Sequence, residues 1–181
     1  MRTRQKRRLV FLAAFTTYFA VLWVLWPTVW VYPLKIFVVF LHELSHAAAG
    51  IATGGTIQRI VLDPYQGGAT YVLGGNSFVM LSAGYLGSLV LGLALLLVAR
   101  SRPGSARKLV LVLGALFLAV AVLFVRNAFG FAFAMLFGVA LIVAARKLPN
   151  NGVVILLTTL GLTSALYALF DIRDDILRRP H

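Results

Sequence analysis

The strongest constraint on the fold is a series of long apolar segments, each bounded by basic or turn-forming residues. We interpret these segments as membrane-spanning helices over 9–26, 33–52, 76–99, 109–125, 131–145 and 153–170. The fourth and fifth segments are short for full spans, so a tilted or partly re-entrant course is expected for one of them. The chain is 61% hydrophobic and 12% charged, whereas a soluble domain has about twice that charged share. The sequence therefore predicts an α-helical membrane protein, a bundle of about six transmembrane helices forming a single domain over 1–181.

The distribution of charge agrees with a membrane location. The formal net charge is +12, and the basic residues gather at the ends of the apolar segments, where they face acidic lipid headgroups. This placement favours contact with the lipid bilayer and disfavours nucleic-acid binding. The chain has no cysteine, which excludes thiol catalysis, disulfides and a cysteine zinc site.

The N-terminus carries five basic residues before the first apolar segment. A signal peptide is one interpretation, but the apolar run is longer than a usual signal-peptide core, and no A-x-A-like cleavage site precedes Pro27. A retained first helix is the better interpretation. The excess of basic residues on one side predicts an integral protein of the cell's inner membrane with a cytoplasmic N-terminus.

After the second apolar segment the sequence changes from helix-like to strand-like. Runs rich in β-branched residues at 56–62 and 69–73 flank turn-forming residues, which predicts a small β-hairpin. Open strand edges are not tolerated against lipid, so this hairpin must face protein or a wet cavity. Two roles remain open: the hairpin is a connector, or its free edge holds an extended substrate by strand addition.

The second apolar segment contains the sequence His42-Glu43-Leu44-Ser45-His46. Histidines four residues apart share one helix face, so His42 and His46 can reach one metal ion, while Glu43 can act on a metal-bound water. Each ionisable group in hydrocarbon costs roughly 2.5–3.5 kcal/mol on insertion scales, so a functional role is favoured. The competing interpretation is a helix whose polar residues only bind its neighbours.

A catalytic zinc ion needs one more protein ligand than the two histidines provide. The only other histidine is the terminal His181, whereas three acids, Asp171, Asp174 and Asp175, follow the sixth apolar segment. We predict Asp171 as the third ligand because it directly follows an apolar run. Asp174 and Asp175 are the alternatives, and a solvated helix end in which the acids pair with arginines is the interpretation without a metal.

Several of these features resemble the site-2 protease family of intramembrane zinc metalloproteases, in its short B-like branch. The resemblance rests on the His-Glu-x-x-His sequence in an early helix, the glycine-rich hairpin after it, Ser-Ala-Gly-Tyr-Leu-Gly at 82–87, and the acidic segment 167–177. It implies zinc as the cofactor, with His42 and His46 as ligands and Glu43 as the catalytic base, acting on membrane-embedded protein substrates. Better-known members carry Asn-Pro and Leu-Asp-Gly motifs in a late helix, of which this chain has only the asparagine, Asn127.

The sequence thus predicts an intramembrane zinc metalloendopeptidase. The alternative is a non-proteolytic membrane scaffold or chaperone that retains a metal site. A zinc transporter is disfavoured, because it would need several acids or histidines along a path and this chain has one such cluster.

Overall fold

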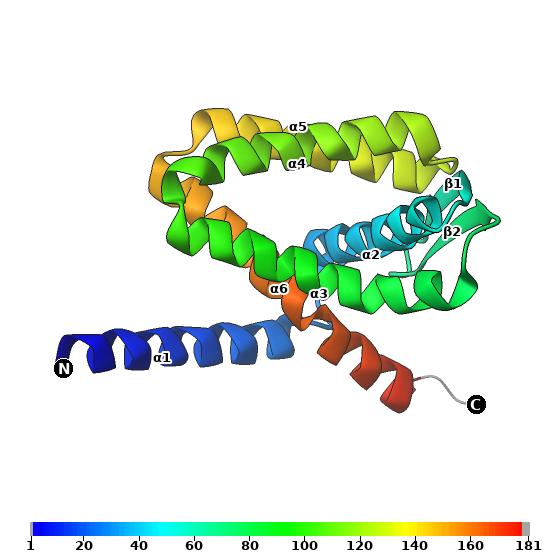
Figure 1. The fold of residues 1–181 in the computed structure, drawn as a ribbon. Coiled ribbons are helices and arrows are strands. Elements are labelled where there is room, and N and C mark those ends of the chain that lie inside the picture. The colour runs from blue at the N-terminus through cyan, green and yellow to red at the C-terminus, as the bar shows by residue number, and fades with distance from the viewer. Residues whose placement is uncertain (1, 179–181) are drawn as a thin grey trace. The chain divides into compact units, whose positions relative to one another are not determined.

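The computed structural model describes residues 2–178, apart from the side chains of residues 2–4, 7, 8, 10, 11, 14, 103 and 168–178. The chain divides into two units, Met1–Pro33 and Leu34–His181, which are described separately. The elements in chain order are α1 (Arg2–Leu25), a 3-10 turn η1 (Val29–Val31), α2 (Tyr32–Ala52), β1 (Thr56–Leu62), β2 (Gly68–Leu73), α3 (Ser77–Ser101), α4 (Pro103–Phe124), α5 (Ala128–Lys147) and α6 (Asn150–Arg178) (Figure 1).

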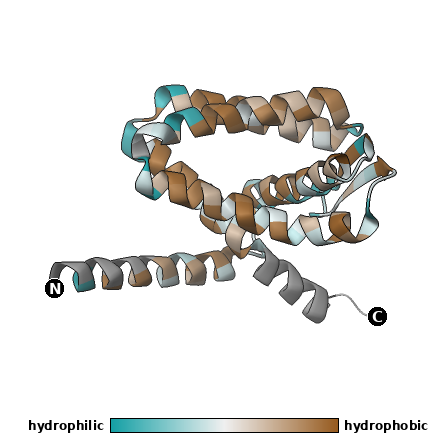
Figure 2. Ribbon diagram, viewed as in Figure 1, coloured by the Kyte–Doolittle hydropathy of each residue, from teal (hydrophilic) through white to brown (hydrophobic). Residues whose placement is uncertain are grey.

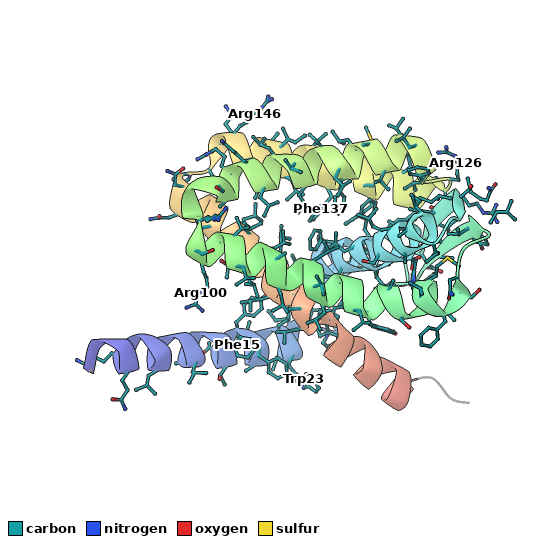
Figure 3. The ribbon with its side chains drawn as sticks, in the orientation of Figure 1. Phe15, Trp23, Arg100, Arg126, Phe137 and Arg146 are labelled. Atoms are coloured by element: carbon teal, nitrogen blue, oxygen red, sulfur yellow. The ribbon has the colours of Figure 1, made fainter. Side chains whose placement is uncertain are left out.

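The first unit consists of α1 and η1. Helix α1 ends where the Thr28 hydroxyl donates a hydrogen bond of 2.6 Å to the carbonyl of Leu25. The rings of Phe19 and Trp23, one turn apart on α1, lie 5.7 Å from each other. The predicted first helix is therefore present, and its described apolar part covers Phe15–Leu25 (Figure 3 labels Phe15 and Trp23).

Five helices of the described chain are long and apolar enough to cross a membrane: α2 with the turn before it, α3, α4, α5 and the described part of α6. Apolar residues dominate α3, α4 and α5, and hydrophilic residues gather at the connections (Figure 2). The predicted fold class, a helical membrane bundle with a small hairpin after the second helix, is confirmed. Of the six predicted spans, five meet the length and hydropathy of a membrane-crossing helix within the described residues. The sixth, α1, has a shorter apolar part among the residues that are described.

Two predicted boundaries are wrong. Residues 100–108, which lie between the predicted helices 76–99 and 109–125, are almost entirely helical: Arg102 alone separates α3 from α4, and Pro103 occupies the first turn of α4. Proline is tolerated at that position because the first helical N–H groups have no intrahelical partner. The fourth and fifth helices are also longer than predicted, since their basic end residues are helical and can extend their charged heads toward the membrane surface.

Small residues bring the helices of the second unit into close contact. Helices α3 and α6 lie side by side, as do α4 and α5 (Figure 1). A Cβ added at Gly92 of α3 would lie 2.6 Å from the backbone nitrogen of Ala165 in α6, and one at Gly114 of α4 would lie 2.8 Å from the carbonyl oxygen of Gly138 in α5. The Ser164 hydroxyl of α6 donates to the Ser88 carbonyl at 2.7 Å. Gly92 and Ser88 of α3 are thus small residues that let a neighbouring helix approach closely.

Aromatic rings join α2 to α4 and α5. Phe37 and Phe40 of α2 lie 5.7 Å and 4.0 Å from the ring of Phe117 in α4. Phe137 of α5 lies 5.4 Å from Phe37 (labelled in Figure 3). This cluster holds the first half of α2, which precedes His42, against α4 and α5.

The hairpin is antiparallel, with Thr56 opposite Leu73 and Leu62 opposite Gly68. The outer edge of β1 is paired by the segment between α4 and α5. The Arg126 N–H donates to the Ile60 carbonyl at 3.1 Å, and the Asn127 amide bonds both the N–H and the carbonyl of Leu62, at 3.2 Å and 2.7 Å. Because the described sheet has only two strands, the outer edge of β2 is the one left for another strand.

Candidate metal centre

Helix α2 brings His42, Glu43 and His46 together. One potential ligand atom from each residue lies within 4.8 Å of the other two. The two imidazole rings stand edge to face, with centroids 4.6 Å apart. No other such group of metal-ligating side chains occurs among the described residues. The four-residue spacing thus places both histidines where one ion can bind them.

The orientation of His46 is set from α3. Its Nδ1 lies 2.6 Å from the carbonyl oxygen of Met80. A carbonyl can only accept, so Nδ1 carries the proton and donates it, which leaves Nε2 unprotonated and available to a metal. Such a bond to a backbone carbonyl is the usual outer support of a metal-binding histidine.

His42 has a buried Nδ1 atom without a hydrogen-bond partner among the described residues. A buried polar atom left unpaired is destabilising unless a group from outside the chain completes the site. The donor set, two imidazoles beside a carboxylate, is one that zinc prefers. The residues present therefore fit a bound metal ion.

The walls around the histidines come from α3 and α6. Gly84 of α3 faces both rings: an added Cβ would lie 2.5 Å from Cε1 of His42 and 2.6 Å from Cε1 of His46. The rings of Tyr85 and Tyr167 stand edge-on to His42, with centroids at 4.8 Å and 6.2 Å. Glycine at position 84 thus allows α3 to approach the face of α2 that carries both histidines.

Glu43 is held by the hairpin. Glu43 is 5% exposed. The Thr70 hydroxyl of β2 lies 2.7 Å from Oε2 of Glu43 and 3.0 Å from the backbone carbonyl oxygen of Glu43. A Cβ added at Gly68 would lie 2.7 Å from Oε1 of Glu43. The backbone of β2 therefore passes directly against the carboxylate.

A cavity of about 550 Å³ opens onto the three residues. Its walls are the face of α2 that carries the histidines, the strand β2 and the first turns of α3, namely His42, Glu43, His46, Gly68, Ala69, Thr70, Val72, Ser77, Met80 and Leu81. The cavity combines apolar side chains with a few polar groups, as ligand-binding pockets do.

The predicted third ligand, Asp171, belongs to α6, but its side chain lies outside the described residues, as do those of Asp174 and Asp175. The helix itself continues through these positions to Arg178. Tyr167, beside His42, is four residues before position 171, so the two positions share a helix face and differ by about 6 Å along the axis. Helix α6 thus approaches the histidines, and the ligand assignment stays a prediction.

Several residues of the site were missed by the sequence interpretation. Thr70 was assigned only to a strand, Gly68 only to a turn, and Gly84 only to helix packing. Alternation along β2 would have shown that 68 and 70 face the same side. The Met80 carbonyl has no sequence signal, because every residue carries that group.

Comparison with known proteins agrees with this site. The family described as Peptidase M50B-like matches residues 15–181. No curated protein and no solved structure gives a significant match. The match covers the His-Glu-x-x-His sequence, the hairpin and the acidic segment on which the resemblance to site-2 proteases rests. The chain belongs to the Peptidase M50B-like family.

Proposed function

We propose that this protein is an intramembrane zinc metalloendopeptidase that hydrolyses peptide bonds of membrane-embedded protein substrates. The observation that carries the proposal is the convergence of His42, Glu43 and His46 on one cavity, inside a membrane-spanning helix of a chain from a peptidase family.

The residues that would hold zinc are His42, His46 and Asp171. Three protein ligands leave a further position open, and zinc bound there would lower the pKa of a water molecule to about 7 and polarise the peptide carbonyl. Two observations support the histidine ligands from α2: the tautomer of His46 set by Met80, and the buried Nδ1 of His42 that lacks a hydrogen-bond partner among the described residues.

Glu43 has the role of general base and acid. Its carboxylate accepts a proton from the attacking water and then delivers it to the nitrogen of the leaving amine. Its burial in the cavity wall keeps it near the reacting atoms and away from bulk solvent. Glu43 is therefore assigned to proton transfer and not to metal binding.

The edge of β2 offers a place for the substrate backbone. A transmembrane helix must unwind before hydrolysis because its peptide groups are hydrogen bonded within the helix. The outer edge of β1 is already paired by 125–127, whereas β2 lines the cavity and has its outer edge open. We therefore favour strand addition to β2 over a purely connecting role for the hairpin.

The proposed location is the inner membrane with a cytoplasmic N-terminus. This orientation follows from the basic residues before α1. It places the ends of α2 and α6, and with them the site, toward the cytoplasmic half of the membrane.

The test uses the purified full-length protein in proteoliposomes with a single-span membrane substrate. We expect about one zinc per chain, its loss in His42→Ala or His46→Ala, and a Glu43→Gln variant that keeps zinc but no longer cleaves. Undiminished cleavage by Glu43→Gln, or zinc retained in the double histidine variant, would refute the assignment.

The third ligand is tested in the same preparation by replacing each acid of 171, 174 and 175 singly. We expect Asp171→Ala to lose zinc and the other two variants to retain it. If Asp174→Ala or Asp175→Ala loses zinc instead, the ligand shifts by one helical turn. If all three variants retain it, the three-ligand site is refuted and the non-proteolytic scaffold becomes the better hypothesis.

A further inference from the structure

We propose that Thr70 is a positioning residue, which holds the Glu43 carboxylate in place for proton transfer and links the base to the strand edge that receives the substrate. This inference rests on the proposed function, because it assigns Thr70 a part in that reaction.

The first observation is the double contact of the Thr70 hydroxyl. Its oxygen lies 2.7 Å from Oε2 of Glu43 and 3.0 Å from the carbonyl oxygen of the same residue. A contact that joins the end of a side chain to its own backbone restricts every torsion between them. The Thr70 hydroxyl donates a hydrogen bond to this carboxylate.

The second observation is the close approach of the β2 backbone. At Gly68, two positions before Thr70 on the same strand face, a Cβ would lie 2.7 Å from both Cγ and Oε1 of Glu43. The carboxylate therefore has the strand backbone on one side and the Thr70 hydroxyl as its hydrogen-bond donor. Its position in the cavity is a consequence of where β2 lies.

The third observation concerns the packing of β2 on α2. Val72, the next residue on this strand face, packs against Gly50 of α2 and against Gly55. A Cβ added at Gly50 would lie 2.9 Å from Cγ1 of Val72, and a Cβ added at Gly55 would lie 2.7 Å from the same atom. Gly50 is two helical turns beyond Glu43, so the strand contacts α2 at two separate points. The register of β2 on α2 is thereby set, and Thr70 is placed at Glu43.

The outer edge of this same strand is open and lines the cavity. A peptide that adds to β2 is aligned by the backbone that carries Thr70. The scissile bond and the base are thus positioned by one element. A misplacement of about 1 Å in a reacting group can reduce a rate by about 100-fold, so this alignment affects kcat.

A purely structural role for Thr70 is the competing explanation. In that case the hydroxyl only attaches the hairpin to α2, and its loss would disturb zinc binding, substrate binding and turnover together. A selective effect on kcat separates the two roles.

The experiment compares Thr70→Val, which removes the hydroxyl at nearly constant shape, with Thr70→Ser, which retains it. The matched control is Thr56→Val, an exposed threonine of β1. With zinc-loaded protein in proteoliposomes, we expect Thr70→Val to lower kcat by about 10- to 100-fold. Its KM should stay within about two-fold of wild type and its zinc content should be unchanged. Thr70→Ser should restore most of the turnover, and Thr56→Val should match wild type.

A second readout does not depend on turnover. In metal-free protein, Thr70→Val should lower the unfolding temperature more in the wild-type background than in the Glu43→Ala background, where the hydroxyl retains only its contact with the backbone carbonyl of residue 43. Equal shifts in both backgrounds would overturn the inference.

The outcomes separate the two proposals. If wild type cleaves and Thr70→Val has an unchanged kcat, the inference fails while the proposed function stands. If Thr70→Val loses zinc, or Thr70→Ser is as impaired as Thr70→Val, the structural role is correct and the inference is overturned. If wild type cleaves no substrate, the proposed function fails and the assignment of Thr70 to proton transfer fails with it, even where the two residues are coupled in unfolding.

Discussion

Replacing Gly84 with alanine adds a single methyl group, which should strongly weaken zinc binding. The added Cβ would lie 2.5 Å from Cε1 of His42 and 2.6 Å from Cε1 of His46, whereas ordinary van der Waals contact begins at 3.4 Å. Each ring would have to move by roughly 1 Å to relieve the overlap. His46 resists this movement because Met80, one turn before Gly84 on α3, holds its Nδ1 at 2.6 Å.

The expected magnitude follows from the tolerance of a metal site. Zinc–ligand distances vary by only about 0.2 Å, so a shift of roughly 1 Å in either ring separates the two nitrogens from a common ion. Loss of an outer supporting contact alone reduces metal affinity by about 10- to 100-fold. Displacement of both ligands should therefore weaken zinc binding by at least about 100-fold. Over-packing should lower the free energy of unfolding by about 1–3 kcal/mol.

The assay is competition for zinc with a chelating dye, followed on purified protein together with the unfolding temperature. The matched control is Gly114→Ala in α4, where the added Cβ would lie 2.8 Å from the carbonyl oxygen of Gly138 in α5. We expect both variants to lose stability but only Gly84→Ala to lose zinc. Wild-type zinc affinity in Gly84→Ala would refute the placement of α3 against the histidines. Equal zinc loss in both variants would show that the effect is general destabilisation.

Two further predictions concern the supports of the bundle. The Arg107 guanidinium donates to carbonyls at the end of α5 and to the Asn150 side chain. Arg107→Ala should therefore lower the free energy of unfolding by about 1–3 kcal/mol in a denaturation assay, whereas the control Lys108→Ala, at an exposed position, should leave it unchanged. Asn127→Ala removes both hydrogen bonds to Leu62 and should accelerate amide hydrogen exchange in β1 more than in α5. Unchanged exchange in β1 would contradict the assigned role of this side chain.

Much of the fold could be predicted because local signals agree with the final structure. The apolar segments gave the helices, and the β-branched runs around Asp63-Pro64 and Gly67-Gly68 gave the hairpin with nearly its observed bounds. The errors lie at helix ends. Arg107 was assigned to a loop for its charge, yet its side chain serves the end of α5 from within α4. A basic residue near a membrane surface is compatible with both states, so composition alone does not distinguish them.

The sequence predicted only the site residues that lie close together in the chain, and not those that other elements bring to α2. The helical period places His42 and His46 on one face without any tertiary information. Thr70 and Gly84 reach the site because β2 and α3 fold back on α2, and no local pattern of either residue indicates its partner. The two tyrosines near His42 are found only when α3 and α6 are both in place. Asp171 stays a prediction, although its helix reaches the histidines through Tyr167.

Under the proposed function, the hairpin supplies polar groups for peptide hydrolysis within an otherwise apolar chain. Strand edges in a membrane need partners, and here one edge is satisfied from within by Asn127 and the segment beside it. The other edge belongs to β2, whose inner face carries the hydroxyl that bonds Glu43 and whose residues line the cavity beside the histidines. An extended peptide would supply the missing hydrogen bonds at the place where the base is held. The cost of an open edge in the membrane is therefore relieved by substrate binding itself, which favours an unwound substrate over an intact helix.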